Sequence, residues 1–71
     1  MKTTRTKNRL KLARIERGLT QTQLADLAGV TRQTIGLIEA GAYNPTLNLC
    51  IQLGKATGKT LDELFWIPGD S

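Results

Sequence analysis

Apolar side chains recur every three or four residues along most of this chain, which is the spacing of one face of an α-helix. Glycines interrupt the recurrence at intervals, and the pattern predicts five helices, over about residues 8–17, 21–28, 32–40, 47–57 and 61–64. Gly18, Gly29 and Gly58 are expected to end three of them, because glycine adopts a left-handed conformation at little steric cost. Residues 41–45, which begin with Gly41 and end with Pro45, are predicted to form a loop.

Each predicted helix has one face that we expect to point into a core. In the first three helices these faces are Leu10, Ala13, Arg14 and Arg17, then Leu24, Ala25 and Leu27, then Ile35 and Ile38. In the last two helices they are Leu47, Cys50, Ile51, Leu53 and Gly54, then Leu61 and Leu64. Phe65, Trp66 and Ile67 follow as an apolar, strand-prone run. The expected fold is therefore all-α, with five helices and a short C-terminal β-strand.

Residues 20–39 contain the start and stop signals of two consecutive helices. Thr20 and Gln23 form a capping box, in which each side chain satisfies an exposed backbone N–H of the other residue. Ala25 is small enough for a second helix to approach, Gly29 can reverse the chain, and Thr31 can cap the helix that follows. This stretch predicts a helix-turn-helix whose second helix suits the major groove of DNA.

The other two helix starts carry similar signals. Thr46 can cap the helix at 47–57, and Thr60 with Glu63 forms a second capping box for the helix at 61–64.

Positive charge is concentrated at the start of the chain. Residues 1–17 hold seven Lys or Arg against Glu16 alone, a net charge of +6, whereas residues 18–71 carry −2. Cations at the start of a helix oppose its dipole, so a polyanionic partner is a natural explanation for them. A solvated, frayed tail is the alternative. Residues 1–7 lack an apolar period, and we expect a flexible basic arm there.

Length and composition limit the other possibilities. Seventy-one residues make one small domain, and a single cysteine, Cys50, excludes an internal disulfide and favours a reduced, cytoplasmic setting. No apolar run approaches the ~18 residues that a membrane span needs. The chain has no histidine and no evident nucleophile–base pair, so we expect neither an enzyme nor a metal or cofactor site.

Several ordered motifs resemble those of one family. The run R-G-L-T-Q-x-x-L-A at 17–25 and the run G-V-T-R-Q-T-I at 29–35 are similar to those of Cro-type, lambda-repressor-like helix-turn-helix regulators. Further similar segments are I-E at 38–39, Y-N-P-T-L at 43–47 and L-D-E-L at 61–64. The resemblance covers about residues 10–65, and we place the domain at 8–64. It implies sequence-specific binding of double-stranded DNA through the helix at 32–40.

The family places base contacts on the outer side of that helix. Arg32 can donate two hydrogen bonds to guanine, and Gln33 can pair with adenine. Gly36 and Leu37 stand where many members carry polar side chains. Leu37 can contact a thymine methyl group, while Gly36 is explained either by close approach to DNA or by tight helix packing. Ordinary polar surface is the alternative for the two polar residues.

The resemblance also implies contacts to the DNA backbone and one structural ion pair. The expected phosphate contacts are made by Gln21, Thr31, Thr34, Tyr43 and Asn44, although Thr31 is equally explained as a cap. Arg14 and Glu39 correspond to a largely buried salt bridge between the first and third helices.

Two apolar surfaces have no evident place in a five-helix core, and they predict a homodimer. The expected interface residues are Leu12, Ile15, Phe65, Trp66 and Ile67. As in the shortest family members, residues 65–71 would pair as an antiparallel ribbon, although the segment could instead fold back over its own first helix. A dimeric repressor recognising an inverted repeat is the leading interpretation. An antitoxin that also binds its own promoter, and an adaptor that binds only protein, are the alternatives.

Overall fold

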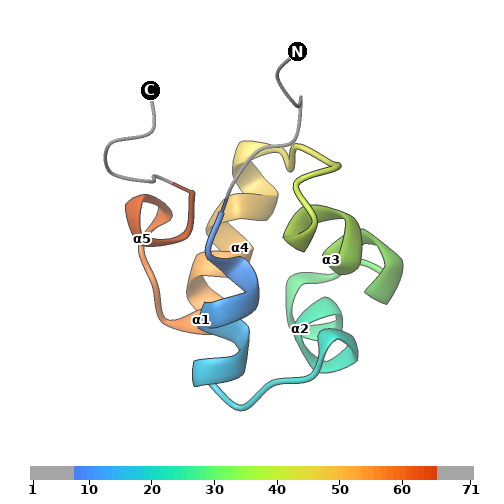
Figure 1. The fold of residues 1–71 in the computed structure, drawn as a ribbon, viewed down its shortest axis with the longest axis horizontal. Coiled ribbons are helices and arrows are strands. Elements are labelled where there is room, and N and C mark those ends of the chain that lie inside the picture. Colours follow the sequence, from blue (N-terminus) through green and yellow to red (C-terminus); the bar gives the residue numbers. More distant parts are fainter. Residues whose placement is uncertain (1–7, 66–71) are drawn as a thin grey trace.

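The computed structural model describes residues 8–65, and within that range it contains five α-helices and no strand (Figure 1). The helices are α1 (Leu10–Glu16), α2 (Gln21–Ala28), α3 (Arg32–Glu39), α4 (Leu47–Thr57) and α5 (Leu61–Phe65). The all-α, five-helix expectation is confirmed. Phe65 is the last residue of α5, whereas the remainder of the expected strand and the expected arm at 1–7 lie outside the described residues.

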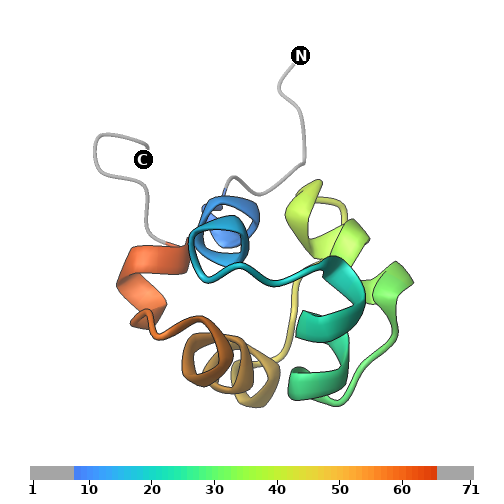
Figure 2. The same cartoon turned by 90° about the horizontal axis from the view of Figure 1, so that it is seen from below.

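The helices form one cluster in which α3 and α5 lie at opposite ends (Figures 1 and 2). α2 packs against both α3 and α4, and α4 continues the packing to α5. α1 closes the arrangement, because it contacts α3 on one side and α5 on the other. α3 therefore has one side against the domain and one side facing outward.

The predicted start signals are all present as hydrogen bonds. The Oγ1 atoms of Thr20, Thr31 and Thr46 each accept a backbone N–H at the start of α2, α3 and α4, at 3.0, 3.2 and 3.2 Å. Thr20 N–H also donates to Gln23 Oε1 at 2.9 Å, which completes the first capping box. Before α5, Thr60 N–H donates to Glu63 Oε1 at 2.8 Å and Thr60 Oγ1 accepts from Glu63 N–H at 3.2 Å.

The glycine stop signals are confirmed as well. Gly29 after α2 and Gly58 after α4 have φ angles of +75° and +73°, in the left-handed region. At the first of these turns Val30 N–H donates to Ala25 O at 3.0 Å, which satisfies a carbonyl that the end of α2 would otherwise leave open.

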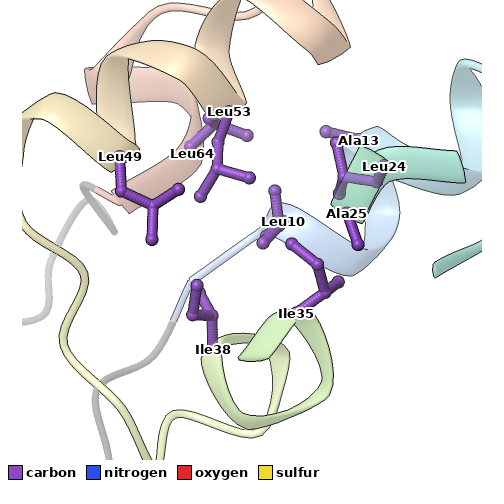
Figure 3. Packing of buried hydrophobic residues seen from close by; sticks show 9 residues of the cluster. All are labelled: Leu10, Ala13, Leu24, Ala25, Ile35, Ile38, Leu49, Leu53 and Leu64. Carbon is purple, nitrogen blue, oxygen red and sulfur yellow. The ribbon is translucent and has the colours of Figure 1, made fainter. Parts of the chain in front are cut away.

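Leu10 lies at the centre of the core (Figure 3). Its side chain is fully buried, and residues of α2, α3, α4 and α5 surround it. The buried apolar cluster consists of Leu10, Ala13, Leu24, Ala25, Ile35, Ile38, Leu49, Leu53 and Leu64. Because each of the five helices contributes to this cluster, the outer face of α3 has a rigid support.

The predicted inner face of α4 is partly wrong. Leu47 and Ile51 are 68% and 40% exposed, whereas Leu49 and Leu53 are buried. The two residues of each pair are four positions apart, so each pair forms a stripe along one helix face. Packing against α2 and α5 buries the stripe of Leu49 and Leu53.

Four further core assignments also need correction, of which one is Leu61, a half-buried residue at the start of α5. Leu27 is 59% exposed, and Ala28 packs against the core in its place. Arg17 is exposed as the residue that follows α1. Cys50 is half-buried at the edge of the core, where its Sγ donates to Pro45 O at 3.9 Å and burial raises the pKa of its thiol.

Candidate nucleic-acid interface

The two sides of α3 differ sharply. Ile35 and Ile38 are fully buried against the core, as predicted. Arg32 and Gln33 are exposed in the first turn, and Leu37 is 41% exposed one turn later. Gly36 lies between them and is half-buried. The four residues predicted to contact bases therefore share the outward side of one helix.

The N-terminal end of α3 is fixed by its own cap. Thr31 Oγ1 accepts Thr34 N–H and also lies 3.0 Å from Thr34 Oγ1. Thr31 remains exposed while it caps the helix, so its side chain has a structural role whether or not it contacts a phosphate. The cap holds the first turn, with Arg32 and Gln33, in a helical conformation.

The C-terminal end of α3 is held by Asn8, which lies just before α1. Its Nδ2 donates to Ile38 O at 2.8 Å, and its Oδ1 accepts Leu10 N–H at 3.1 Å. Asn8 is not among the site residues that the sequence pattern predicts. An Asn before a helix is a local signal for capping, but a contact across 30 residues of sequence has no local signal.

Arg14 and Glu39 form the ion pair that the resemblance implies. Arg14 Nε lies 2.7 Å from Glu39 Oε2, and the two side chains are only 12% and 5% exposed. Arg14 Nη1 also donates to Leu19 O at 2.9 Å. The pair joins α1 to the last residue of α3, and the bond to Leu19 extends the connection to the segment before α2.

Gln21 continues this connection to the outward side of α3. Its Nε2 donates to Glu39 Oε1 at 3.0 Å, and its Oε1 accepts from Arg32 Nη1 at 3.2 Å. We call Arg14, Glu39, Gln21 and Arg32 the α3 network. It runs from a nearly buried ion pair to an exposed guanidinium, and sequence reasoning did not predict the links through Gln21.

The remaining predicted contacts to the DNA backbone are spread around α3. Thr31 and Thr34 lie at its start, whereas Tyr43 and Asn44 lie in the loop that follows it. Tyr43 is 42% exposed and Asn44 is exposed. Their contacts with phosphate stay predictions.

The predicted dimer residues fall into two groups. Leu12 and Ile15 of α1 are 56% and 55% exposed, and they lie three residues apart on one side of the helix. Phe65, by contrast, packs partly against the core, so the expectation that it has no place there is wrong. Trp66 and Ile67 lie outside the described residues.

Two other features of the described residues bear on the site. No helix between residues 8 and 65 is both long and apolar enough to cross a membrane. Over the same range, no three His, Cys, Asp or Glu side chains gather as a metal site would require.

Comparison with known proteins decides the family. A family model described as helix-turn-helix matches residues 10–64, which include all the residues of α3 and its network. This chain belongs to the helix-turn-helix family. The Cro-type resemblance found in the sequence is confirmed.

Helix-turn-helix proteins from bacteria and archaea are similar to this chain. The HTH-type transcriptional regulator YgzD of Bacillus subtilis is 39% identical over 61 residues, which are 86% of this chain and 92% of that protein. An HTH-type transcriptional regulator of Methanocaldococcus jannaschii is 44% identical over 59 residues, which are 83% of this chain and 89% of that protein.

A solved structure has a similar fold. The restriction-modification controller protein C.AhdI from Aeromonas hydrophila has a TM-score of 0.73 and 34% identity, with coverage of 78% of this chain and 80% of that one. This helix-turn-helix protein is therefore a DNA-binding transcriptional regulator by family.

Proposed function

We propose that this protein is a homodimeric repressor that recognises an inverted-repeat operator through α3. One observation carries the proposal: Arg32 and Gln33 are exposed on a helix whose opposite side is fully buried and whose two ends are fixed by Thr31 and Asn8. A helix held in this way can place side chains in the major groove with little loss of conformational freedom.

The four outward residues of α3 divide the base contacts between them. Arg32 donates to guanine O6 and N7, Gln33 pairs with adenine, and Gly36 and Leu37 meet apolar groups in the groove. The phosphate contacts of Gln21, Thr31, Thr34, Tyr43 and Asn44 set the register of the protein on the duplex without selecting sequence.

A two-fold symmetric dimer matches a two-fold symmetric operator. Two α3 helices related by a two-fold axis meet half-sites about one turn of DNA apart, roughly 34 Å. The exposed Leu12 and Ile15, with residues 65–71, form the interface in this proposal. A dimer on a promoter blocks the polymerase, and we place this action in the cytoplasm at the nucleoid. The named relatives are transcriptional regulators, which supports a regulator over the antitoxin or enzyme interpretations.

Selection of bound sites from random duplexes tests this function. We expect a two-fold symmetric consensus for the wild type. Arg32→Ala is expected to cost ~1–3 kcal/mol of binding free energy and to relax the preference at one base position, and Gln33→Ala to act in the same way at a neighbouring position.

Lys55→Ala is the matched control. It also removes one exposed cation, but from the last turn of α4, so selectivity is expected to be retained. If both α3 variants select the wild-type consensus with wild-type affinity, α3 is not the recognition helix.

A further inference from the structure

Gly36 is a glycine that the fold does not require. The other described glycines have a structural reason to lack a side chain: positive φ angles at Gly18, Gly29, Gly41 and Gly58, and a Cβ that would lie 2.8 Å from Lys59 O at Gly54. Gly36 has no positive φ, and a Cβ added there would lie 3.8 Å from Gln21 Nε2, an ordinary contact with the end of a flexible side chain.

This glycine also weakens the helix that carries it. Glycine in a helix interior is less stable than alanine, and α3 has only eight residues. Since nothing within residues 8–65 excludes a methyl group at this position, the explanation must lie in what α3 meets. Tight helix packing, one of the two explanations open at the sequence level, does not account for Gly36.

The backbone at Gly36 leaves no free polar group. Its carbonyl accepts Ala40 N–H at 3.0 Å, and its N–H is directed along the helix axis to the preceding turn. The groups left to face outward are the Cα hydrogens, beside the exposed Leu37 side chain, and Gln21 Nε2 lies 3.8 Å from the position of a Cβ. A phosphate or a polar base edge would find no partner on this backbone, whereas a small apolar group would fit the space of the missing Cβ.

We propose that Gly36 is a specificity-determining residue that accommodates the C5-methyl group of one thymine against the backbone of α3. Leu37 packs against one side of this methyl group. This inference rests on the proposed function, because it assumes that α3 enters the major groove. The thymine methyl is the apolar group that the major groove presents. At this position the protein would read a methyl group by shape instead of by hydrogen bonds.

The inference is tested by removing one methyl group from the DNA and, separately, by adding one to the protein. Starting from the selected operator, each thymine is replaced in turn by uracil, which lacks only the methyl. The wild type is expected to lose about fourfold in affinity at one thymine per half-site, the factor that corresponds to one buried methyl-sized group.

Gly36→Ala should show the opposite preference. The variant is expected to bind the thymine operator at least fourfold more weakly than the wild type, about the same one-methyl factor. It should recover most of this loss on the uracil operator, because the alanine methyl then occupies the vacant space. Leu37→Ala is expected to reduce the difference between thymine and uracil in the wild-type background.

Thermal unfolding separates binding from folding. Gly36→Ala is expected to unfold at or above the wild-type midpoint, whereas the comparator Gly54→Ala, which meets Lys59 O, should unfold below it. A lowered midpoint for Gly36→Ala would show that the fold needs this glycine and would overturn the inference.

The binding results can also overturn it. Equal binding of the wild type to the thymine and uracil operators, or an equal loss by Gly36→Ala on both, would show that no methyl group is accommodated at Gly36. In either case the wild type still selects an operator, so the proposed function stands. If the wild type selects no duplex, the proposed function itself fails.

Discussion

Glu39 is the residue at which three helices are joined. Its carboxylate accepts from Arg14 of α1 at 2.7 Å and from Gln21 of α2 at 3.0 Å, while its own backbone ends α3. The side chain is only 5% exposed, so its negative charge is stabilised by these partners and not by water.

Removal of one partner of this ion pair is expected to be costly. Glu39→Ala leaves the Arg14 guanidinium nearly buried without its counter-charge, which should lower the free energy of unfolding by about 3–5 kcal/mol. The double variant Arg14→Met/Glu39→Leu removes both charges and should recover most of this loss. Urea denaturation of the two proteins measures the difference. Equal destabilisation by the single and double variants would contradict this account.

The sequence indicated the residues of this site better than their connections. Arg14 and Glu39 were paired through a family resemblance, and Arg32 and Gln33 were placed on the outer face by helical spacing. The sequence leads us to expect Gln21 only at a phosphate, because its partners, 11 and 18 positions away, lie on the next helix and the sequence does not show how the two helices pack. Side-chain amides that bridge helices depend on the packed tertiary structure, and a linear pattern does not contain that information.

At the scale of elements, helix boundaries were predictable and the inner face of α4 was not. The caps at Thr20, Thr31, Thr46 and Thr60 operate within three residues, so local sequence is sufficient to identify them. α4 carries two apolar stripes of equal helical spacing. Only its contacts with α2 and α5 decide which stripe is buried, and those contacts are properties of the whole fold.

The capping box of α5 contains a carboxyl group, so the stability of this helix is expected to depend on pH. The hydrogen bond from Thr60 N–H lowers the pKa of the Glu63 carboxyl below its ordinary range. Because the folded pKa is below the unfolded one, the stabilisation is present above the ordinary glutamate range and is lost as the pH falls through the folded pKa.

An NMR titration of the Glu63 side chain measures this shift. We expect a midpoint below that of an unstructured glutamate, accompanied by a loss of amide-exchange protection at Leu64, whose N–H donates to Thr60 O at 3.1 Å. Glu63→Gln keeps the accepting oxygen but does not titrate, so its Leu64 exchange should lack the acid-dependent step. A midpoint at the ordinary value would show that the capping box does not form.

At the scale of the whole molecule, the small core leaves apolar surface uncovered. Leu12 and Ile15 on α1 are each more than half exposed, and a chain of 71 residues buries a limited fraction of its surface by itself. Association of two copies would bury this surface and would provide two recognition helices.

Sedimentation of three variants tests the dimer. The wild type is expected to sediment as a dimer, and both a chain that ends at Phe65 and Ile15→Glu as monomers. The truncation keeps Phe65 because that side chain packs against the core. Leu27→Glu is the matched control, since Leu27 is 59% exposed but lies on α2, and it should remain dimeric. A monomeric wild type would remove the basis for a symmetric operator.

The hydrogen bond between Arg32 and Gln21 has a consequence for how the protein searches a chromosome. Arg32 Nη1 donates to Gln21 Oε1 at 3.2 Å, and the guanidinium has further N–H donors that can face a base, so in the proposed complex this bond would orient the side chain before it meets DNA. Under the proposed function, phosphate contacts alone would hold the protein on DNA where no guanine is presented, and the protein would slide onward. Dwell time should lengthen where a guanine is presented, because a guanidinium already oriented by Gln21 loses little conformational freedom when it binds.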